Sequence, residues 1–439
     1  MIKDKEYKGL ALNFISTWSP RRCGIGSFTQ DTVGALALRE EDVKVIKIHP
    51  IDKDNLGYIF PITEKHIIRQ MDTSSWANAA EIIIARNHKQ WSENGLRSIT
   101  ILEHEYGLDG DGEDNNFNLI ARRLKEERLP SVAVLHTLLQ NPNDHQKRVI
   151  QELGENCSKL IIITPTAKDI LKDKYNINTE KIEYIPHGIP LENRDISRED
   201  MKQKFDLGGK VVISTPGFVS PGKGLEYGIL GFSEFLKKVS PDFRKNVVYV
   251  IAGQTHPDEL AKNDGEDYYR RKLEKIVEEN KLEENVIFMD EHLGDRKLYD
   301  FIRASDVGII PYTNPDQISS GILSYFVGIG TPCVSTNFIY ARDLFSDGKG
   351  MPFHIDDLVN SNDDNFKSEV SGVLVNFNDP DSIAKGSRYV FENYHTTESN
   401  EYGKGVRMGW PVVAANMVSL FVTLIKDKKT NVCRIPFID

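Results

Sequence analysis

Cysteine is scarce in this chain: it occurs four times in 439 residues, at Cys23, Cys157, Cys333 and Cys433. The four positions are far apart, and none has the CxxC or Cys/His spacing of a structural metal site. Apolar runs of 18 residues are also absent, and the charged N-terminus lacks the apolar core of a signal peptide. We therefore expect reduced thiols, no metal centre and no membrane span, in a cytoplasmic protein.

Positive charge is in the minority. Asp and Glu number 65 against 55 Lys and Arg, which gives a formal net charge of −10 at pH 7. An acidic chain is a poor default binder of nucleic acid or of an anionic membrane. We expect no nucleic-acid partner, but a local cationic site for a phosphate ligand stays open, as does a homo-oligomer.

Short apolar runs alternate with amphipathic segments along the chain, which is typical of βαβ units and parallel sheets. A first series of strands is expected at residues 9–15, 42–49, 81–85, 98–102, 131–135, 159–163 and 181–185. After a polar segment, a second series is expected at residues 210–215, 246–252, 285–289, 307–310 and 331–335. Helices are expected between them, among others at residues 29–38, 117–126, 224–239 and 408–426.

This alternation predicts an α/β protein of two Rossmann-like, doubly wound lobes with a cleft between them. We expect the N-terminal lobe over residues 1–205, joined by a C-terminal helix at 406–439 that crosses back to it, and the second lobe over 206–405. Ligands of open parallel sheets bind at the carboxyl ends of the strands. The informative residues should therefore follow strands directly.

The segment GFVSPGKG, residues 217–224, follows an expected strand and opens a helix. It nearly matches the phosphate-binding loop G-x-x-x-x-G-K-[ST]. The mismatch is Gly224, because that loop needs a Ser or Thr hydroxyl there for Mg²⁺. What remains is a glycine turn at Gly217, the lysine Lys223 and a helix N-terminus, a set that suits a diphosphate. A P-loop phosphotransferase stays an alternative, since residues 285–291 resemble its acidic strand, and so does a plain turn.

The segment PDQISSGI, residues 315–322, leads from an expected strand into an apolar helix. Ser319 and Ser320 are good helix N-caps, and Gly321 lets the backbone approach a ligand closely. Free N–H groups at this helix start suit an anion, aided by the helix dipole. Ordinary capping explains one serine, but the second anion-suited turn at Lys223 favours ligand binding.

Weaker signals lie in the N-terminal half. Gly24 and Gly26, in the segment PRRCGIGSF, permit a close-approaching loop after the first strand, although a plain βα turn explains them equally well. Three histidines stand at strand ends: His104, His136 and His187. A single histidine is usually structural, whereas three in one lobe indicate a site. Neither a zinc-protease motif nor a G-x-S-x-G elbow is present.

Together these segments resemble the retaining GT-B glycosyltransferases of family 4, the glycogen-synthase-like group. The resemblance covers nearly all 439 residues. Its most specific pieces are SPGKG and DQISSG…GIGTPCVST, while RRCGIGSF, HEYG, LHTLLQNP and IPHGI are similar to one subgroup. It implies transfer of a hexosyl unit, with a lean to mannose or glucose, from a nucleoside diphosphate sugar to a saccharide or small-molecule acceptor. It implies neither a metal nor a separate cofactor.

The resemblance also implies roles for single residues. Lys223 would hold the diphosphate, Gly26 would close over it, and His136 would lie beside the donor sugar. The backbone N–H groups offered to the diphosphate would be those of Ser320, Gly321 and Ile322. The expected nucleotide and substrate site is completed by Gly24, His187, Gly217, Asp316, Ser319 and Tyr325. The expected catalytic residues are His136, Lys223 and Gln317.

Two departures from the family pattern concern the donor. The family has Arg where this chain has Phe218, so another basic residue has to replace it. The family's two glutamates, which contact the sugar and the ribose, fall on Gln317 and Tyr325. Gln317 can still bond sugar hydroxyls, and Tyr325 can make one bond to the ribose. A GT-B protein that binds a sugar nucleotide or a glycan without turnover is therefore a further alternative.

Overall fold

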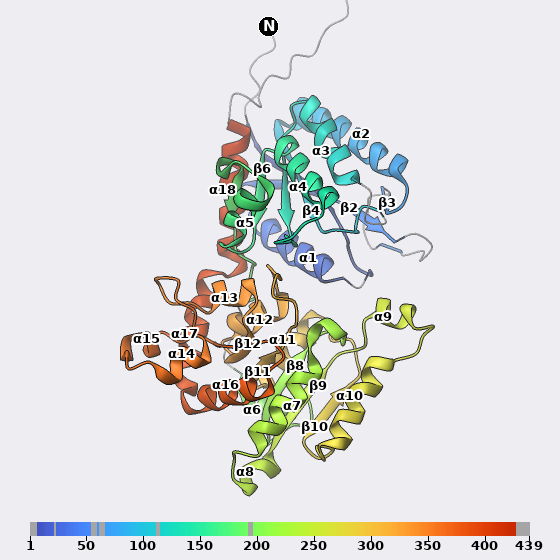
Figure 1. Cartoon of the computed structure of the whole chain (residues 1–439). Helices are drawn as coiled ribbons and strands as arrows, with labels where there is room; N and C mark the ends of the chain where they lie inside the picture. Colours follow the sequence, from blue (N-terminus) through green and yellow to red (C-terminus); the bar gives the residue numbers. More distant parts are fainter. Residues whose placement is uncertain are drawn as a thin grey trace, which may run out of the picture. The chain divides into compact units, whose positions relative to one another are not determined.

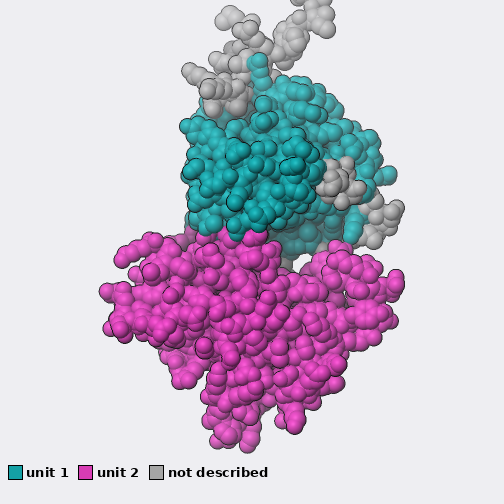
Figure 2. All heavy atoms as spheres, viewed as in Figure 1, with its two compact units in different colours: residues 1–188, 410–439 teal, residues 189–409 magenta. Residues whose placement is uncertain are grey.

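The computed structural model describes residues 7–21, 23–53, 59–60, 66–110, 115–191 and 196–426. The chain divides into two compact units, which we call unit 1 (residues 1–188 and 410–439) and unit 2 (residues 189–409) (Figure 2). Each unit contains a parallel sheet with helices packed on it (Figure 1). The expected α/β class with two Rossmann-like sheets is confirmed.

Unit 1 has a seven-stranded sheet in the order β3-β2-β1-β4-β5-β6-β7, and its neighbouring strands pair in parallel. The order reverses between β1 and β4, which creates a topological switch point at their carboxyl ends. The strands are β1 (Gly9–Ser16), β2 (Val43–Asp52), β3 (Ile68–Arg69), β4 (Leu96–His104), β5 (Ser131–Leu135), β6 (Lys159–Ile162) and β7 (Ile182–Tyr184).

The helices of unit 1 correct one expected strand. They are α1 (Gly24–Ala37), α2 (Thr73–Lys89), α3 (Asn116–Glu126), α4 (Asp144–Asn156), α5 (Ala167–Tyr175) and α18 (Trp410–Lys426). Residues 81–85, expected as a strand, belong to α2, where Ile83 and Ile84 are buried. A short apolar run fits the buried face of a helix as well as a strand, and only the length of the element separates the two.

Helix α18 returns the end of the described chain to unit 1, as the sequence predicted. It packs against α1 and buries one face, on which Trp410, Val413, Met417 and Phe421 lie. The Trp410 ring centre is 5.7 Å from that of Phe28 in α1. Residues 427–439, the rest of the expected C-terminal segment, lie outside the described residues.

Unit 2 has a six-stranded parallel sheet in the order β10-β9-β8-β11-β12-β13, with its own switch point between β8 and β11. The strands are β8 (Val211–Pro216), β9 (Val247–Ala252), β10 (Val286–Met289), β11 (Val307–Ile310), β12 (Cys333–Thr336) and β13 (Val373–Val375). The main helices are α6 (Arg198–Gln203), α7 (Leu225–Leu236), α9 (Pro257–Lys262), α10 (Tyr268–Glu279), α11 (Asp295–Ala304), α12 (Gly321–Ile329), α16 (Pro380–Glu392) and α17 (Tyr394–Arg407).

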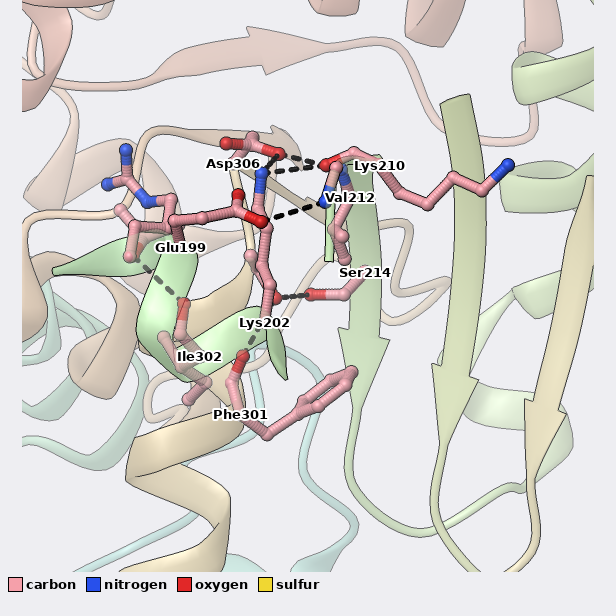
Figure 3. A network of polar contacts seen from close by, with 12 residues as sticks. Glu199, Lys202, Lys210, Val212, Ser214, Phe301, Ile302 and Asp306 are labelled. Carbon is pink, nitrogen blue, oxygen red and sulfur yellow. Dashed lines mark hydrogen bonds and ion pairs between the residues drawn. The ribbon is translucent and has the colours of Figure 1, made fainter. Parts of the chain in front are cut away.

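A buried polar network joins α6 to the unit 2 sheet (Figure 3). Lys202, which is 7% exposed, places Nζ 2.8 Å from Asp306 Oδ2 and donates to the Lys210 carbonyl at 2.7 Å. The same Asp306 oxygen accepts the backbone N–H of Val212 at 2.7 Å. A buried charge pair persists only when its remaining hydrogen-bonding groups are satisfied, and these bonds provide that. They hold α6 against β8 and β11.

Two absences apply to the described ranges alone. Within them, no helix is long and apolar enough to cross a membrane. Within the same ranges, no three His, Cys, Asp or Glu side chains gather as a metal ion would require. The described cysteines, Cys23, Cys157 and Cys333, form no disulfide, and Cys433 lies outside the described residues.

Candidate functional site

The two phosphate-suited segments meet at the switch point of the unit 2 sheet. Residues 217–224 follow β8, and residues 315–322 follow the neighbouring strand β11. A Cβ on Gly217 would lie 3.4 Å from Ile322 Cγ1, so the two segments are in contact range. Two motifs that were identified separately in the sequence thus share one edge of the sheet.

Glycine is required by the backbone at both ends of the first segment. Gly217 has φ +111°, and its N–H donates to the Ala252 carbonyl at 2.9 Å. Gly224 has φ +59° and is the N-cap of α7. A Cβ on Gly224 would lie 2.1 Å from the Pro311 carbonyl oxygen. The Ser or Thr of a P-loop therefore does not fit at position 224.

Lys223 ends a short 3₁₀ turn, η3 (Pro221–Lys223), and is partly exposed. Its Nζ lies 3.9 Å from the ring centre of Tyr312. This cation–π contact restrains the ammonium group but leaves its charge in place. Among the described residues, no carboxylate comes within ion-pair distance of Lys223. The described residues therefore leave this charge uncompensated.

The start of α12 offers backbone donors beside this lysine. Ser320 is the N-cap, as predicted, and its Oγ accepts the Leu323 N–H at 3.2 Å. In the part of the chain that the structure describes, the N–H groups of Gly321 and Ile322 have no acceptor. Such groups at a helix N-terminus favour an anion.

Gln317 and Asp316 lie in the loop before α12. Gln317 Nε2 donates to the Ser319 carbonyl at 2.7 Å, and the Gln317 carbonyl accepts the Tyr340 N–H at 3.0 Å. The Asp316 N–H donates to Asn314 Oδ1 at 3.0 Å. The Gln317 side chain therefore braces the loop with its amide nitrogen, whereas its oxygen forms no hydrogen bond among the described residues.

Tyr325 lies inside α12 with its side chain 5% exposed. Its ring packs edge-on against Tyr299 of α11, with the ring centres 5.0 Å apart. The described structure thus shows a packing role for Tyr325, and the expected bond to a ribose stays a prediction.

Two histidines that the sequence analysis missed surround Phe218, the residue at the family's arginine position. His256 contacts the Phe218 ring at 5.1 Å, and His292 stacks on it at 5.5 Å between centres. His256 Nδ1 accepts the N–H of Asp258, so Nε2 carries the proton of the neutral ring. The histidines come from the segments after β9 and β10, and no local motif connects them with Phe218.

In unit 1, His136 is paired with a buried carboxylate. His136 Nε2 lies 2.8 Å from Glu103 Oε2, and the side chains are 6% and 0% exposed. The His136 N–H also donates to the His104 carbonyl at 3.1 Å. Because a carboxylate only accepts hydrogen bonds, Nε2 carries the proton. Sequence reasoning missed Glu103, whose only local signal is its place at the end of β4, one residue before His104.

The other two histidines are buried and held neutral. Burial, and to a smaller extent electrostatic repulsion from the nearby His136, lowers the pKa of His104 to about 3. Burial also lowers the pKa of His187 to about 4, and its Nδ1 donates to the Gly188 carbonyl at 2.7 Å. His136 and His187 contact the same Phe28 ring, at 4.9 and 5.0 Å between centres. The Phe28 ring therefore links His136 and His187, and the backbone links His136 to His104.

Gly24 and Gly26 form part of the first turn of α1, so the prediction of a loop at these residues is wrong. A Cβ on Gly26 would lie 3.4 Å from Thr17 Oγ1, so this glycine allows the helix start to approach the end of β1. Helix α1 therefore begins five residues earlier than the sequence pattern indicated, at Gly24 rather than at Thr29. Arg22 of the same motif lies outside the described residues.

Comparison of the sequence with protein-family models gave no match, and no curated protein matched it either. Solved structures do match. HepE from Anabaena in complex with UDP has a TM-score of 0.64 at 14% identity, covering 94% of this chain and 100% of HepE. A glycosyltransferase from Rickettsia africae has a TM-score of 0.67 at 12% identity, covering 96% and 100%. Sucrose-phosphate synthase from Thermosynechococcus elongatus has a TM-score of 0.66 at 13% identity, covering 94% and 99%.

These alignments cover 94–96% of this chain, so they extend over both units. The chain therefore has the GT-B fold. The resemblance to GT-B glycosyltransferases that the sequence suggested is confirmed at the level of the fold. A fold alone does not define an activity, which has to be argued from the site.

Proposed function

We propose that the protein is a retaining glycosyltransferase of the family 4 type. It would transfer a hexosyl unit, with mannose or glucose favoured, from a nucleoside diphosphate sugar to a saccharide or small-molecule acceptor. The observation that carries this proposal is the pair of adjoining segments in unit 2, where Lys223 and the N–H groups of Gly321 and Ile322 stand uncompensated. Negative charge develops on the leaving diphosphate, and such preorganised donors stabilise it.

The lobes and remaining residues take the roles that the resemblance implies. The second lobe, with Gly217, Ser319, Ser320 and the residues just named, binds the nucleotide, and the first lobe serves the acceptor. His136 contacts the donor sugar, and the proton on its Nε2 is fixed by Glu103. Gln317 presents its free amide oxygen to a sugar hydroxyl, because its nitrogen is used within the loop.

The described donors can meet the charge of a diphosphate without a cation between protein and ligand, so we expect activity without a metal. HepE was solved with UDP, with UDP and glucose, and with UDP-glucose. This makes UDP-glucose the first donor to test for the present chain. GDP-mannose and ADP-glucose are the necessary comparisons, since the base and the sugar are open.

Two alternatives make different demands on the site. A P-loop phosphotransferase needs a hydroxyl at position 224, and the 2.1 Å approach to Pro311 argues against one. A protein that binds a sugar nucleotide without turnover would keep the site at Lys223 and yet release no sugar. Donor hydrolysis therefore separates the second alternative from the proposal.

The direct experiment is a thermal-shift panel of UDP, GDP and ADP with their sugars, followed by donor hydrolysis with and without EDTA. We expect one base to stabilise the protein, with hydrolysis that EDTA leaves unchanged. Gly321→Val should abolish the shift, because the branched side chain covers the free N–H groups of the first turn. Gly403→Val is the matched control, since a Cβ at that α17 position meets open space. A full shift in Gly321→Val would contradict the proposal.

A further inference from the structure

A polar row crosses the middle of the unit 1 sheet, away from the strand ends. Asn13 of β1 is in register with Lys47 of β2 on one side and with Thr100 of β4 on the other. Registered residues of parallel strands lie on the same face. Faces of a parallel sheet that helices cover are normally apolar, and Asn13 and Thr100 are 4% and 0% exposed. These polar residues therefore need an explanation.

Three neutral polar side chains on this face have no hydrogen-bond partner among the described residues. Thr100 Oγ1 is buried and has no hydrogen-bond partner. Within the described residues, the side chains of Asn13 and of Ser98, which is 5% exposed, form no hydrogen bond either. Ser98 lies on the same face, in register with Ala11. A buried polar group without a partner lowers stability, which applies to the Thr100 hydroxyl, and packing alone does not explain the two further unpaired side chains beside it.

A cavity of about 210 Å³ opens over this face. Asn13 and Ser98 line its floor, and the end of α2 with the short π-helix η1 (Gln90–Asn94) lines the other side. Three cationic side chains border it: Lys47, Arg86 and Lys89. No Asp or Glu is among the described residues that line it, although the chain as a whole carries a net charge of −10.

We propose that this cavity binds a phosphate group, either inorganic phosphate or a small phosphomonoester. Arginine and lysine supply the charge, and the Asn13 amide and Ser98 hydroxyl supply neutral donors. The volume holds a tetrahedral oxyanion with several waters, or a phosphorylated metabolite of small size. The cavity shares no residue with the diphosphate site of unit 2, and the inference does not depend on the proposed transferase activity.

The test is calorimetric titration of inorganic phosphate into the Lys223→Ala protein, in which the unit 2 site has lost its lysine. Lys47→Met in that background should weaken binding about tenfold or more, because a charge-assisted hydrogen bond is lost. Lys44→Met is the matched control: Lys44 lies on the same strand, is exposed, donates to the Glu40 carbonyl at 2.6 Å and does not line the cavity. We expect it to bind phosphate like the parent.

A second variant separates binding from folding. Asn13→Leu replaces an unpaired amide by an apolar side chain with the same branching at Cγ. It should therefore raise the melting temperature in phosphate-free buffer while weakening the binding of phosphate. Parent-like affinity in both Lys47→Met and Asn13→Leu, or acetate binding as tightly as phosphate, would overturn the inference. Glucose 6-phosphate binding more tightly than phosphate would identify a phosphomonoester site, and equal affinities would identify free phosphate. These experiments measure binding and melting, not turnover. They can therefore be interpreted even if the proposed transferase activity is wrong.

Discussion

In unit 2 the groups suited to a ligand are left uncompensated, whereas in unit 1 the polar groups at the strand ends are paired or neutral. Lys223 has no carboxylate partner among the described residues, and the first N–H groups of α12 have no acceptor. By contrast, Glu103 holds His136, and burial keeps His104 and His187 uncharged at neutral pH.

The difference indicates what each unit supplies. Uncompensated positive charge at the surface suits a charged, soluble ligand that arrives with its own counter-charge. Buried rings, of which two are kept neutral and one is fixed by a carboxylate, suit precise contact with a neutral group such as a sugar. A polar residue that follows a strand therefore offers charge to a ligand in unit 2, whereas in unit 1 it offers a buried hydrogen-bonding group.

Replacing Lys223 tests whether the uncompensated charge in unit 2 serves the ligand, and it should have the largest effect on activity. Lys223→Ala should lose about 2–4 kcal/mol of transition-state stabilisation, because the leaving diphosphate loses its cation. The measurement is kcat/KM for the donor, with the melting temperature as a check on folding. Lys245→Ala, a change of a well exposed lysine on the same unit, is the control. Turnover of Lys223→Ala at the parent rate would show that this turn does not bind the leaving group.

Acidification tests the unit 1 half. Since the folded pKa of His187 is about 4 and its ordinary value is 6.5, the unfolded chain takes up the proton first as the pH falls. The titration of His187 therefore leaves the free energy of unfolding unchanged above about pH 6.5. Between pH 6.5 and pH 4 it falls by about 3 kcal/mol because of this residue. Urea unfolding at several pH values measures it. Tryptophan fluorescence reports on unit 1 alone, because all four tryptophans of the chain belong to that unit. They are Trp18, Trp76, Trp91 and Trp410.

The matched variant is His187→Gln, which cannot take up a proton. It should be less stable at pH 7.5, but its stability should fall less steeply on acidification. If the parent and the variant lose stability in parallel between pH 6.5 and 4, His187 is not the group that responds. His104, with a pKa of about 3, would then be the next to replace.

Neutralising Glu103 sharpens the comparison further. Glu103→Gln should lower the stability of unit 1 by about 1–3 kcal/mol, because a buried hydrogen bond to a charged group becomes a neutral one. It should also lower kcat more than it changes KM for the donor. Glu105→Gln is the control: burial raises the pKa of Glu105, which accepts the Thr137 hydroxyl at 2.7 Å, so its charge matters less. Equal effects of the two changes would remove the special role of Glu103.

Gln317→Ala should have the smallest effect. Loss of one neutral hydrogen bond to the sugar should weaken the binding of the nucleotide sugar by about 0.5–1.5 kcal/mol. The bare nucleoside diphosphate should bind as before if the free oxygen reads the sugar. Paired titrations of both ligands measure this. Because Gln317 Nε2 also braces Ser319, an equal loss for both ligands would assign the residue to loop geometry instead.

Periodicity and strand-end logic predicted most of the fold. The strands at residues 131–135 and 307–310 match β5 and β11 without any shift of their bounds, because a proline and a polar residue stand on either side of each short apolar run. The strand prediction for residues 81–85 was wrong because four consecutive apolar residues fit a buried helix as well as a buried strand. The short strands β3 and β13 gave no signal of their own, since two or three residues carry no period.

The local backbone geometry of the candidate site was predictable where its residues are close together in the sequence. The glycines around Lys223 and the cap at Ser320 follow from turn and capping chemistry. The surroundings of Phe218 were not predictable, since His256 and His292 come from separate strand ends that only the sheet order brings together. The partnership of Glu103 and His136 likewise depends on the pairing of β4 with β5.

The place where the chain passes between the units has a consequence for synthesis. Gly188 lies so close to Trp410 that a Cβ would be 2.1 Å from its ring, and the Ile189 N–H donates to the Met408 carbonyl at 3.0 Å. The outgoing and returning segments therefore run side by side. On the ribosome, unit 2 emerges as one uninterrupted stretch, while unit 1 waits for α18 to cover α1. The half of the protein that is translated first is thus the half that is completed last.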